Sequence, residues 1–204
     1  MDMNIVCLDL EGVLVPEIWI AFAEASGIPE LKRTTRDEPD YEKLMAWRMD
    51  ILRSHGLTLS DIQDTISQIH PLEGAYEFLS KLRSITQVVI LSDTFKEFAS
   101  PLMKQLGWPT ILCNSLVIDE NNMLCGMKLR QVDGKRKAIE GFRSMGFRTF
   151  AAGDSYNDLS MIHTADKGCL FRAPENILKE EPDLKLCTTY DEFYSVIESF
   201  VKED

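Results

Sequence analysis

Five short apolar runs alternate along this chain with longer stretches of helical spacing. The runs cover residues 4–10, 87–93, 110–114, 148–154 and 167–171. Continuous apolar runs of this length are typical of strands that are buried on both faces. The intervening patterns that predict helices cover residues 74–85, 95–107, 134–146 and 156–166. Because strands alternate with helices, the pattern predicts an α/β fold with a parallel sheet.

The stretch between the first two predicted strands is longer than a single crossover helix requires. It contains three more helical patterns, over residues 16–27, 41–56 and 59–69. Proline and glycine residues that suit hinges flank this stretch. We therefore predict a helical cap domain of residues 15–72, inserted into a core domain of residues 1–14 and 73–204. Residues 116–129 predict a β-hairpin with an asparagine-rich tip.

The composition is that of an ordinary globular protein, since 45% of the 204 residues are hydrophobic. No apolar stretch approaches the roughly 18 residues of a membrane span, and no basic region precedes the first strand, as a signal peptide would require. We therefore expect a cytoplasmic protein. The 5 cysteines form no C-x-x-C pair and have no histidine at ligand spacing, which argues against a disulfide framework and a zinc site.

The formal net charge is −11, from 33 acidic and 22 basic residues. At long range this charge repels nucleic acids and anionic membranes, so we expect neither as a partner. An anionic substrate must instead be held by a few well-placed cations. The sequence leaves the choice between a monomer and a homodimer open.

Two carboxylates, Asp9 and Glu11, stand two positions apart at the end of the first apolar run. On an extended segment these positions face the same side, so the two groups repel each other unless a cation or a shared proton separates them. The pair therefore indicates metal binding or acid–base chemistry. The alternative is a solvated strand end before a turn at Gly12.

Reactive side chains follow three of the predicted strands: Asp9 with Glu11, Ser92 with Asp93 and Thr94, and Asp154 with Asp158. The carboxyl ends of parallel strands border one ligand crevice, so these groups should meet there. Converging carboxylates suit Mg²⁺, which binds one or two of them together with a backbone carbonyl, water and a substrate phosphate. We expect the metal site to use Asp9, Glu11, Asp154 and Asp158, and the alternative for Asp158 is a helix cap.

A phosphate beside the metal needs donors close to it. Ser92 offers a hydroxyl next to the backbone N–H groups of a helix start, and Lys135 offers an ammonium group. Arg136 and Lys137 compete with Lys135 for this role, and a short basic run is also typical of a solvated face.

The motifs "LDLEGVL", "VVILSDTF", Lys135 and "GDSYNDLSM" occur in this order along the chain. Together they resemble the haloacid dehalogenase superfamily, whose pattern is a nucleophilic Asp, a Ser or Thr, a Lys and a late acidic G-D-x-x-x-D. The resemblance implies a Rossmann-like, doubly wound parallel sheet with an inserted helical cap. It also implies phosphoryl transfer through an aspartyl-phosphate on Asp9, with Glu11 as the acid and base of the two steps.

The segments "LVPE", "DYEKLMAWRMDIL" and "IHPLEGAYEF" look like the phosphoserine phosphatase branch of this superfamily. In that branch an acid and a cap arginine hold the amino-acid part of the substrate, and the matching positions here are Glu17 and Arg48. The rest of the implied substrate-binding set is Ser92, Asp93, Thr94, Lys135 and Asn157. From spacing alone, Glu17 also suits a helix start, and Arg48 suits an ion pair on an amphipathic helix. Tyr41, Met45 and Trp47 either line the pocket or form the core of the cap.

Two departures from most relatives are Glu11 in place of Asp and "LSDTF" in place of Ser-Gly-Gly. In both, the chain resembles bifunctional members of the branch, which combine phosphoserine phosphatase and homoserine phosphotransferase activities. The resemblance implies Mg²⁺-dependent transfer of a phosphoryl group from phosphoserine to water or to homoserine. The alternative is a plain phosphatase of phosphoserine or of another small phosphomonoester.

Two other classes of protein share part of this pattern. A bacterial receiver domain uses similar acids, a Ser or Thr and a Lys as a switch, but it is shorter and has no insertion after its first strand. An inactive relative that only binds ligands would lack some of the required groups, and this chain carries all of them. The pattern therefore favours an enzyme.

Overall fold

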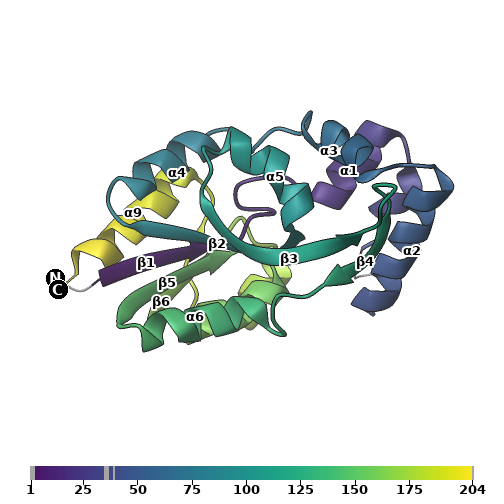
Figure 1. The fold of residues 1–204 in the computed structure, drawn as a ribbon. Helices are drawn as coiled ribbons and strands as arrows, with labels where there is room; N and C mark the ends of the chain where they lie inside the picture. Colours follow the sequence, from purple (N-terminus) through teal and green to yellow (C-terminus); the bar gives the residue numbers. More distant parts are fainter. Residues whose placement is uncertain (1–2, 35–36, 39, 204) are drawn as a thin grey trace.

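The computed structural model describes residues 3–34, 37–38 and 40–203, which form one seven-stranded sheet with helices on both faces (Figure 1). The strands are β1 (Met3–Leu8), β2 (Gln87–Phe95), β3 (Thr110–Ile118), β4 (Leu124–Lys128), β5 (Phe147–Gly153), β6 (Lys167–Phe171) and β7 (Leu186–Cys187). Their order is β4-β3-β2-β1-β5-β6-β7, with β3 and β4 antiparallel and the other neighbouring pairs parallel. The predicted α/β class and doubly wound parallel sheet are confirmed.

Helices cover the sheet on both sides. They are α1 (Ile18–Ser26), α2 (Tyr41–Ser54), α3 (Leu59–Ile66), α4 (Ala75–Arg83), α5 (Lys96–Gln105), α6 (Gly134–Ser144), α7 (Leu159–Thr164), α8 (Glu175–Glu180) and α9 (Tyr190–Lys202). Two 3-10 turns are η1 (Pro29–Lys32) and η2 (Tyr156–Asp158). Helices α4, α5 and α9 pack on one face of the sheet, and α6, α7 and α8 pack on the other. None of the described helices is both long enough and apolar enough to cross a lipid bilayer.

The two faces of β1 belong to different apolar cores. Val6 and Leu8 belong to the core that includes α4, α5 and α9, whereas Ile5 and Cys7 belong to the core that includes α6 and α7. All four side chains are buried. Burial on both faces explains why this strand is an unbroken apolar run in the sequence.

No strand or helix was predicted at β7, α8 or α9. Strand β7 has 2 residues and α8 has 6, so neither is long enough to show a period. Helix α9 buries Phe193, Ile197 and Phe200 at helical spacing, so a signal for it is present in the sequence. The predicted hairpin is confirmed, and β3 extends past residue 114 because its second half pairs with β4.

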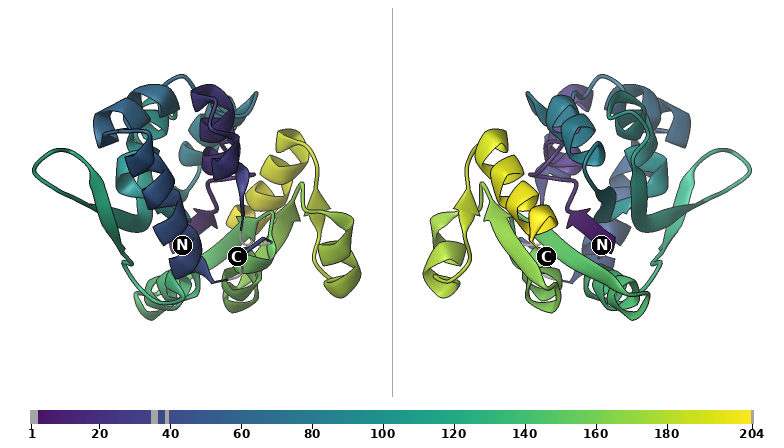
Figure 2. Two further views of the ribbon diagram at one scale, coloured as in Figure 1. Left: turned by 90° about the vertical axis from the view of Figure 1, so that its right-hand side faces the viewer. Right: turned by 90° about the vertical axis from the view of Figure 1, so that its left-hand side faces the viewer.

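Helices α1, α2 and α3 lie between β1 and α4 and gather where the β3–β4 hairpin projects from the sheet (Figures 1 and 2). The tip of the hairpin contacts the start of α3. The Leu59 amide donates to the Asn122 carbonyl (2.7 Å), and the Asn122 side chain donates to Ser60 Oγ (2.6 Å). One apolar cluster runs from the sheet into these three helices, so the core itself does not mark a boundary between two domains. The division into a cap domain of residues 15–72 and a core domain stays a prediction.

Candidate active site

A cavity of about 940 Å³ lies at the carboxyl ends of β1, β2 and β5 and is bordered by α1 and α2. The predicted site residues that line it are Asp9, Glu11, Glu17, Arg48, Ser92, Asp93, Thr94, Lys135, Asp154 and Asn157. The remaining one, Asp158, is fully buried and accepts a hydrogen bond from Lys135. The fold thus brings together groups from the ends of β1, β2 and β5, from the start of α6, and from the segment of α1 and α2 that follows β1.

Three carboxylates form a cluster at the floor of the site. Asp9, Asp154 and Asp158 each place an oxygen within 4.8 Å of the other two. The Asp9 amide donates to the Ala152 carbonyl of β5 (2.9 Å), so the neighbouring strands fix the cluster. Lys135 Nζ lies 3.0 Å from Asp9 Oδ1 and 2.7 Å from Asp158 Oδ1. The single ammonium group of Lys135 therefore balances only part of the charge of the three carboxylates in the cluster. A divalent cation would neutralise the remaining negative charge.

This crowding changes the pKa values of the groups in the cluster. Burial, followed by the charge of Asp158, raises the pKa of Asp9 well above its ordinary value and the pKa of Asp154 to about 6. Burial alone would lower the pKa of Lys135, but Asp9, Asp158 and Asp93 raise it well above its ordinary value. Lys135 therefore stays charged. Oxygen ligands with excess negative charge fit Mg²⁺.

Protein donors already engage both oxygens of Asp158. Oδ1 accepts from Lys135, and Oδ2 accepts from the amides of Asp154 and Ser155 (3.1 Å each) and from the Ser155 hydroxyl (3.0 Å). The Asp158 side chain thus completes the capping box of η2 and is also a member of the carboxylate cluster, and its role in metal binding stays a prediction. Its oxygens are already engaged, so Asp9 and Asp154 are better placed than Asp158 to contact a metal ion directly, while Asp158 holds Lys135 in place.

Two glycines allow the carboxylates to approach this closely. Gly12 has a φ of +74°, and a Cβ there would lie 2.2 Å from Asp154 Oδ2. A Cβ on Gly153 would lie 2.1 Å from Asp158 Cγ. A side chain at either position would displace a carboxylate of the cluster.

Mg²⁺ is expected to stabilise the protein against thermal unfolding. Binding to the folded chain alone contributes about 2.7 kcal/mol at a concentration 100 times the Kd, which raises Tm by roughly 5–10 °C for a chain of this size. Calorimetric scans with Mg²⁺ and with EDTA measure the rise. Asp154→Asn should abolish it, whereas Asp119→Asn, in the turn of the hairpin, should preserve it. A full rise in Asp154→Asn would show that Asp154 is not a ligand.

Glu11 faces the start of α1. Its Oε1 accepts a hydrogen bond from the Ile18 amide (2.7 Å). Burial, followed by the charge of Glu17, raises the pKa of Glu11 to about 7. A carboxyl group with this pKa exchanges its proton near neutral pH, as a general acid and base must. Among the described residues, the carboxylate cluster comprises Asp9, Asp154 and Asp158 and leaves Glu11 out, so a contribution of Glu11 to the metal site stays a prediction.

Arg48 is buried in the wall of the cavity. Its guanidinium stacks on Trp19, 4.4 Å from a ring centroid, and its Nη2 donates to the Arg33 carbonyl (2.7 Å). In the described part of the chain, Nε has no hydrogen-bond partner, and the ion pairs made by α2 do not involve Arg48. A buried guanidinium with an unused donor is suited to bind a carboxylate.

Other residues of the insertion divide between the cavity and the core. Glu17 occupies the N-cap position of α1 but makes no side-chain capping hydrogen bond within the described part of the chain, and its side chain lines the cavity together with Tyr41. Met45 instead belongs to the apolar core, and Trp47 lies 5.2 Å from the Arg33 guanidinium. Trp19 lines the cavity although the sequence did not single it out, because an aromatic residue within the apolar stretch of α1 is equally typical of core.

The structure distinguishes the members of the basic run. Lys135 is buried in the site, whereas Arg136 pairs with two nearby acids at the surface and Lys137 is exposed. At the end of β2, Ser92 and Thr94 are buried, and the Thr94 amide donates to Ser92 Oγ (3.2 Å). A phosphate donor pair of Ser92 and Lys135 therefore fits the cavity.

A family model described as haloacid dehalogenase-like hydrolase matches residues 3–166. The chain belongs to this family. A relative from Pseudomonas aeruginosa named phosphoserine phosphatase ThrH is 57% identical over 190 residues, 93% of either chain. A phosphoserine phosphatase from Pseudomonas syringae pv. tomato is 56% identical over 190 residues, 93% of this chain and 80% of that protein. A solved substrate-bound phosphoserine phosphatase has the same fold, with a TM-score of 0.75 at 21% identity over 93% of this chain and 95% of that chain.

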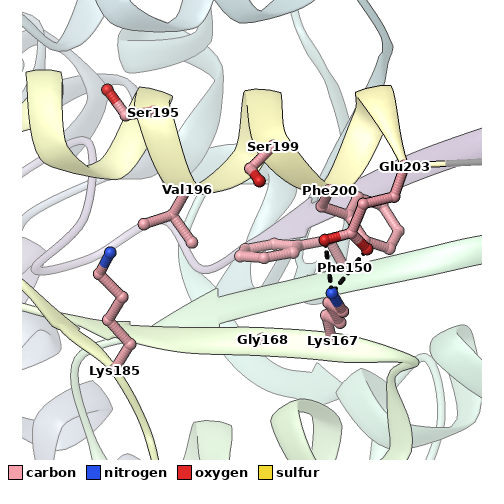
Figure 3. A pocket seen from close by; sticks show the side chains of 9 residues that line it. All are labelled: Phe150, Lys167, Gly168, Lys185, Ser195, Val196, Ser199, Phe200 and Glu203. Carbon is pink, nitrogen blue, oxygen red and sulfur yellow. Dashed lines mark hydrogen bonds and ion pairs between the residues drawn. The ribbon is translucent and has the colours of Figure 1, made fainter.

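This haloacid dehalogenase-like hydrolase has a second, smaller cavity of about 450 Å³ between β6 and α9 (Figure 3). Val196 and Phe200 form part of its wall, and its charged groups are Lys185 and the Lys167–Glu203 ion pair. Lys167 begins β6, so this cavity lies at the amino end of that strand, away from the carboxylate cluster. Among the described residues that line it, the one carboxylate, Glu203, is already paired with Lys167.

Proposed function

We propose that this hydrolase is a Mg²⁺-dependent phosphoserine phosphatase that also transfers the phosphoryl group to homoserine. The observation that carries the proposal is the placement of Asp9, 3.0 Å from Lys135 and within the carboxylate cluster, in the cavity that Arg48 borders. Identity of 57% to a phosphoserine phosphatase ThrH, over 93% of either chain, supports the choice of substrate.

In the first step Asp9 attacks phosphorus, and the bond between phosphorus and the serine oxygen breaks. Glu11 gives its proton to that oxygen, and Lys135 offsets the charge on the phosphoryl oxygens. The product is an aspartyl-phosphate on Asp9. Asp9 and Asp154 would hold Mg²⁺, which supplies further charge neutralisation when bound.

In the second step an acceptor hydroxyl attacks the aspartyl-phosphate, and Glu11 takes its proton. Asp9 returns to a free carboxylate. The same residue therefore serves as acid and then as base, which its pKa of about 7 supports.

The amino-acid part of the substrate lies toward the insertion in this proposal. Arg48 binds the carboxylate of serine, and Glu17 binds its ammonium group. Homoserine carries the same two groups and one more methylene, which is worth only about 1 to 3 kcal/mol in discrimination. The same pocket therefore accepts both amino acids, with homoserine entering after serine leaves.

Phosphorus NMR on the protein with Mg²⁺, L-phosphoserine and L-homoserine tests the proposal. We expect signals of both homoserine phosphate and orthophosphate. Orthophosphate alone would establish the alternative, a plain phosphatase. Failure to consume phosphoserine, when another small phosphomonoester is hydrolysed, would reject the substrate.

Glu11→Asp is expected to shift the product ratio toward orthophosphate by about tenfold in the same assay. The shorter side chain withdraws the base from an acceptor whose position Arg48 fixes, and such a displacement is costly, whereas water is free to follow the base. Glu198→Asp, on the surface of α9, is the matched control and should not change the ratio. An unchanged ratio in Glu11→Asp would show that the length of the Glu11 side chain does not determine phosphoryl transfer to homoserine.

The cellular location, the partners and the assembly of the enzyme are the remaining points. We infer a cytoplasmic protein that acts on small amino-acid substrates and binds no nucleic acid, in line with its net charge of −11. The choice between a monomer and a homodimer stays open. Light scattering of the purified chain measures the assembly directly.

A further inference from the structure

Asp93 lies among the groups that would hold a phosphate, yet it has the same sign of charge as a phosphate. Its Oδ2 is 3.5 Å from Lys135 Nζ and accepts a hydrogen bond from Asn157 Nδ2 (3.0 Å). The side chain is 54% exposed and lines the active-site cavity. A carboxylate of the protein thus engages two donors that a bound phosphate would use.

Hydrogen bonds hold the backbone at Asp93, whereas its side chain is 54% exposed. The Asp93 carbonyl accepts from Asn114 Nδ2 (2.9 Å), and Asn114 Oδ1 accepts from the Arg130 amide (3.0 Å). A single oxygen of Asp93 contacts both Lys135 and Asn157, so one rotation of the side chain releases both donors together. Lys135 keeps its closer contacts with the buried acids of the cluster in either case.

We propose that Asp93 competes with phosphate for Lys135 and Asn157 and thereby keeps the affinity for free phosphate low. The inference rests on the proposed function and deepens it. A phosphorylated amino acid is also anchored at Arg48, so it displaces Asp93, whereas inorganic phosphate lacks that anchor. The cost of displacing Asp93 is the same for both ligands, but only the amino-acid ester has contacts with Arg48 that offset it, so inorganic phosphate leaves the site readily.

Asp93→Asn tests the inference, with Asp133→Asn as the matched control. Both variants remove one negative charge from the wall of the same cavity, but Asp133 pairs with Arg136 and not with Lys135. Titration calorimetry of inorganic phosphate in the presence of Mg²⁺ gives Kd for each protein. We expect Kd to fall about fivefold in Asp93→Asn and by less than about twofold in Asp133→Asn, because the charge of Asp133 is already balanced by Arg136.

An unchanged or larger Kd in Asp93→Asn, or an equal fall in Asp133→Asn, overturns the inference. Both side chains are partly exposed, so neither variant should lose the fold, and thermal scans verify this. The titration does not depend on turnover. If phosphate binding changes as expected but the unaltered protein does not hydrolyse phosphoserine, the proposed substrate fails while the competition by Asp93 stands.

Discussion

Asp9→Asn is expected to lower kcat for phosphoserine by at least about 10⁴-fold, the scale on which removal of a catalytic nucleophile acts. The neutral amide of Asn does not attack phosphorus to form the acyl phosphate. The folded state should tolerate the change, because Asn has nearly the shape of Asp and its side-chain oxygen can still accept a hydrogen bond from Lys135, which lies 3.0 Å from Asp9 Oδ1. Release of orthophosphate and thermal scans measure the two effects.

The same variant has a readout that is independent of turnover. Beryllium fluoride, which mimics a phosphoryl group, should form an adduct with the unaltered protein in the presence of Mg²⁺, and fluorine NMR should show its bound signal. Asp9→Asn should lose this signal, and Asp133→Asn should retain it. Turnover close to that of the unaltered protein in Asp9→Asn, or an adduct on another side chain, would contradict the role of Asp9.

Lys135→Met is expected to lower both activity and stability. Loss of the ammonium removes stabilisation of charge in the transition state, which costs on the order of 10²–10³ in kcat. It also leaves Asp9 and Asp158 buried without their cation, which costs about 3–5 kcal/mol in the free energy of unfolding. Kinetic assays with phosphoserine and urea unfolding without Mg²⁺ measure these losses.

Lys137→Met is the matched control for Lys135→Met. Lys137 is two residues further along α6 and is exposed, so its replacement should change neither kcat nor the free energy of unfolding appreciably. Mg²⁺ should restore part of the stability of Lys135→Met, because the bound cation supplies countercharge to the same acids. Equal losses of kcat and of stability in both variants would show that residues 135–137 act through their overall positive charge and not through the contacts of Lys135 with Asp9 and Asp158.

The sequence was sufficient to locate the acids of the site because they follow apolar runs. A parallel sheet places the carboxyl ends of its strands along one edge, so Asp9, Ser92 and Asp154 meet once the order of strands is known. The same pattern left β7 and α9 without a prediction. Strand β7 has only two residues, too few to show a period. Helix α9 follows it directly, and without a predicted strand before it the alternation of strands and helices gave no place for this helix.

Periodicity thus determined the α/β class, the hairpin and the strand ends that carry the reactive groups. Only the tertiary structure decided that Lys135 enters the site while Arg136 turns outward, that Arg48 stacks on Trp19, and that Asp93 reaches Lys135. Each of these contacts joins residues from different elements or depends on which face of a helix packs against the sheet. The spacing of residues along the chain specifies neither the contacts between elements nor the helix face that is buried, because the directions and distances between elements arise from packing.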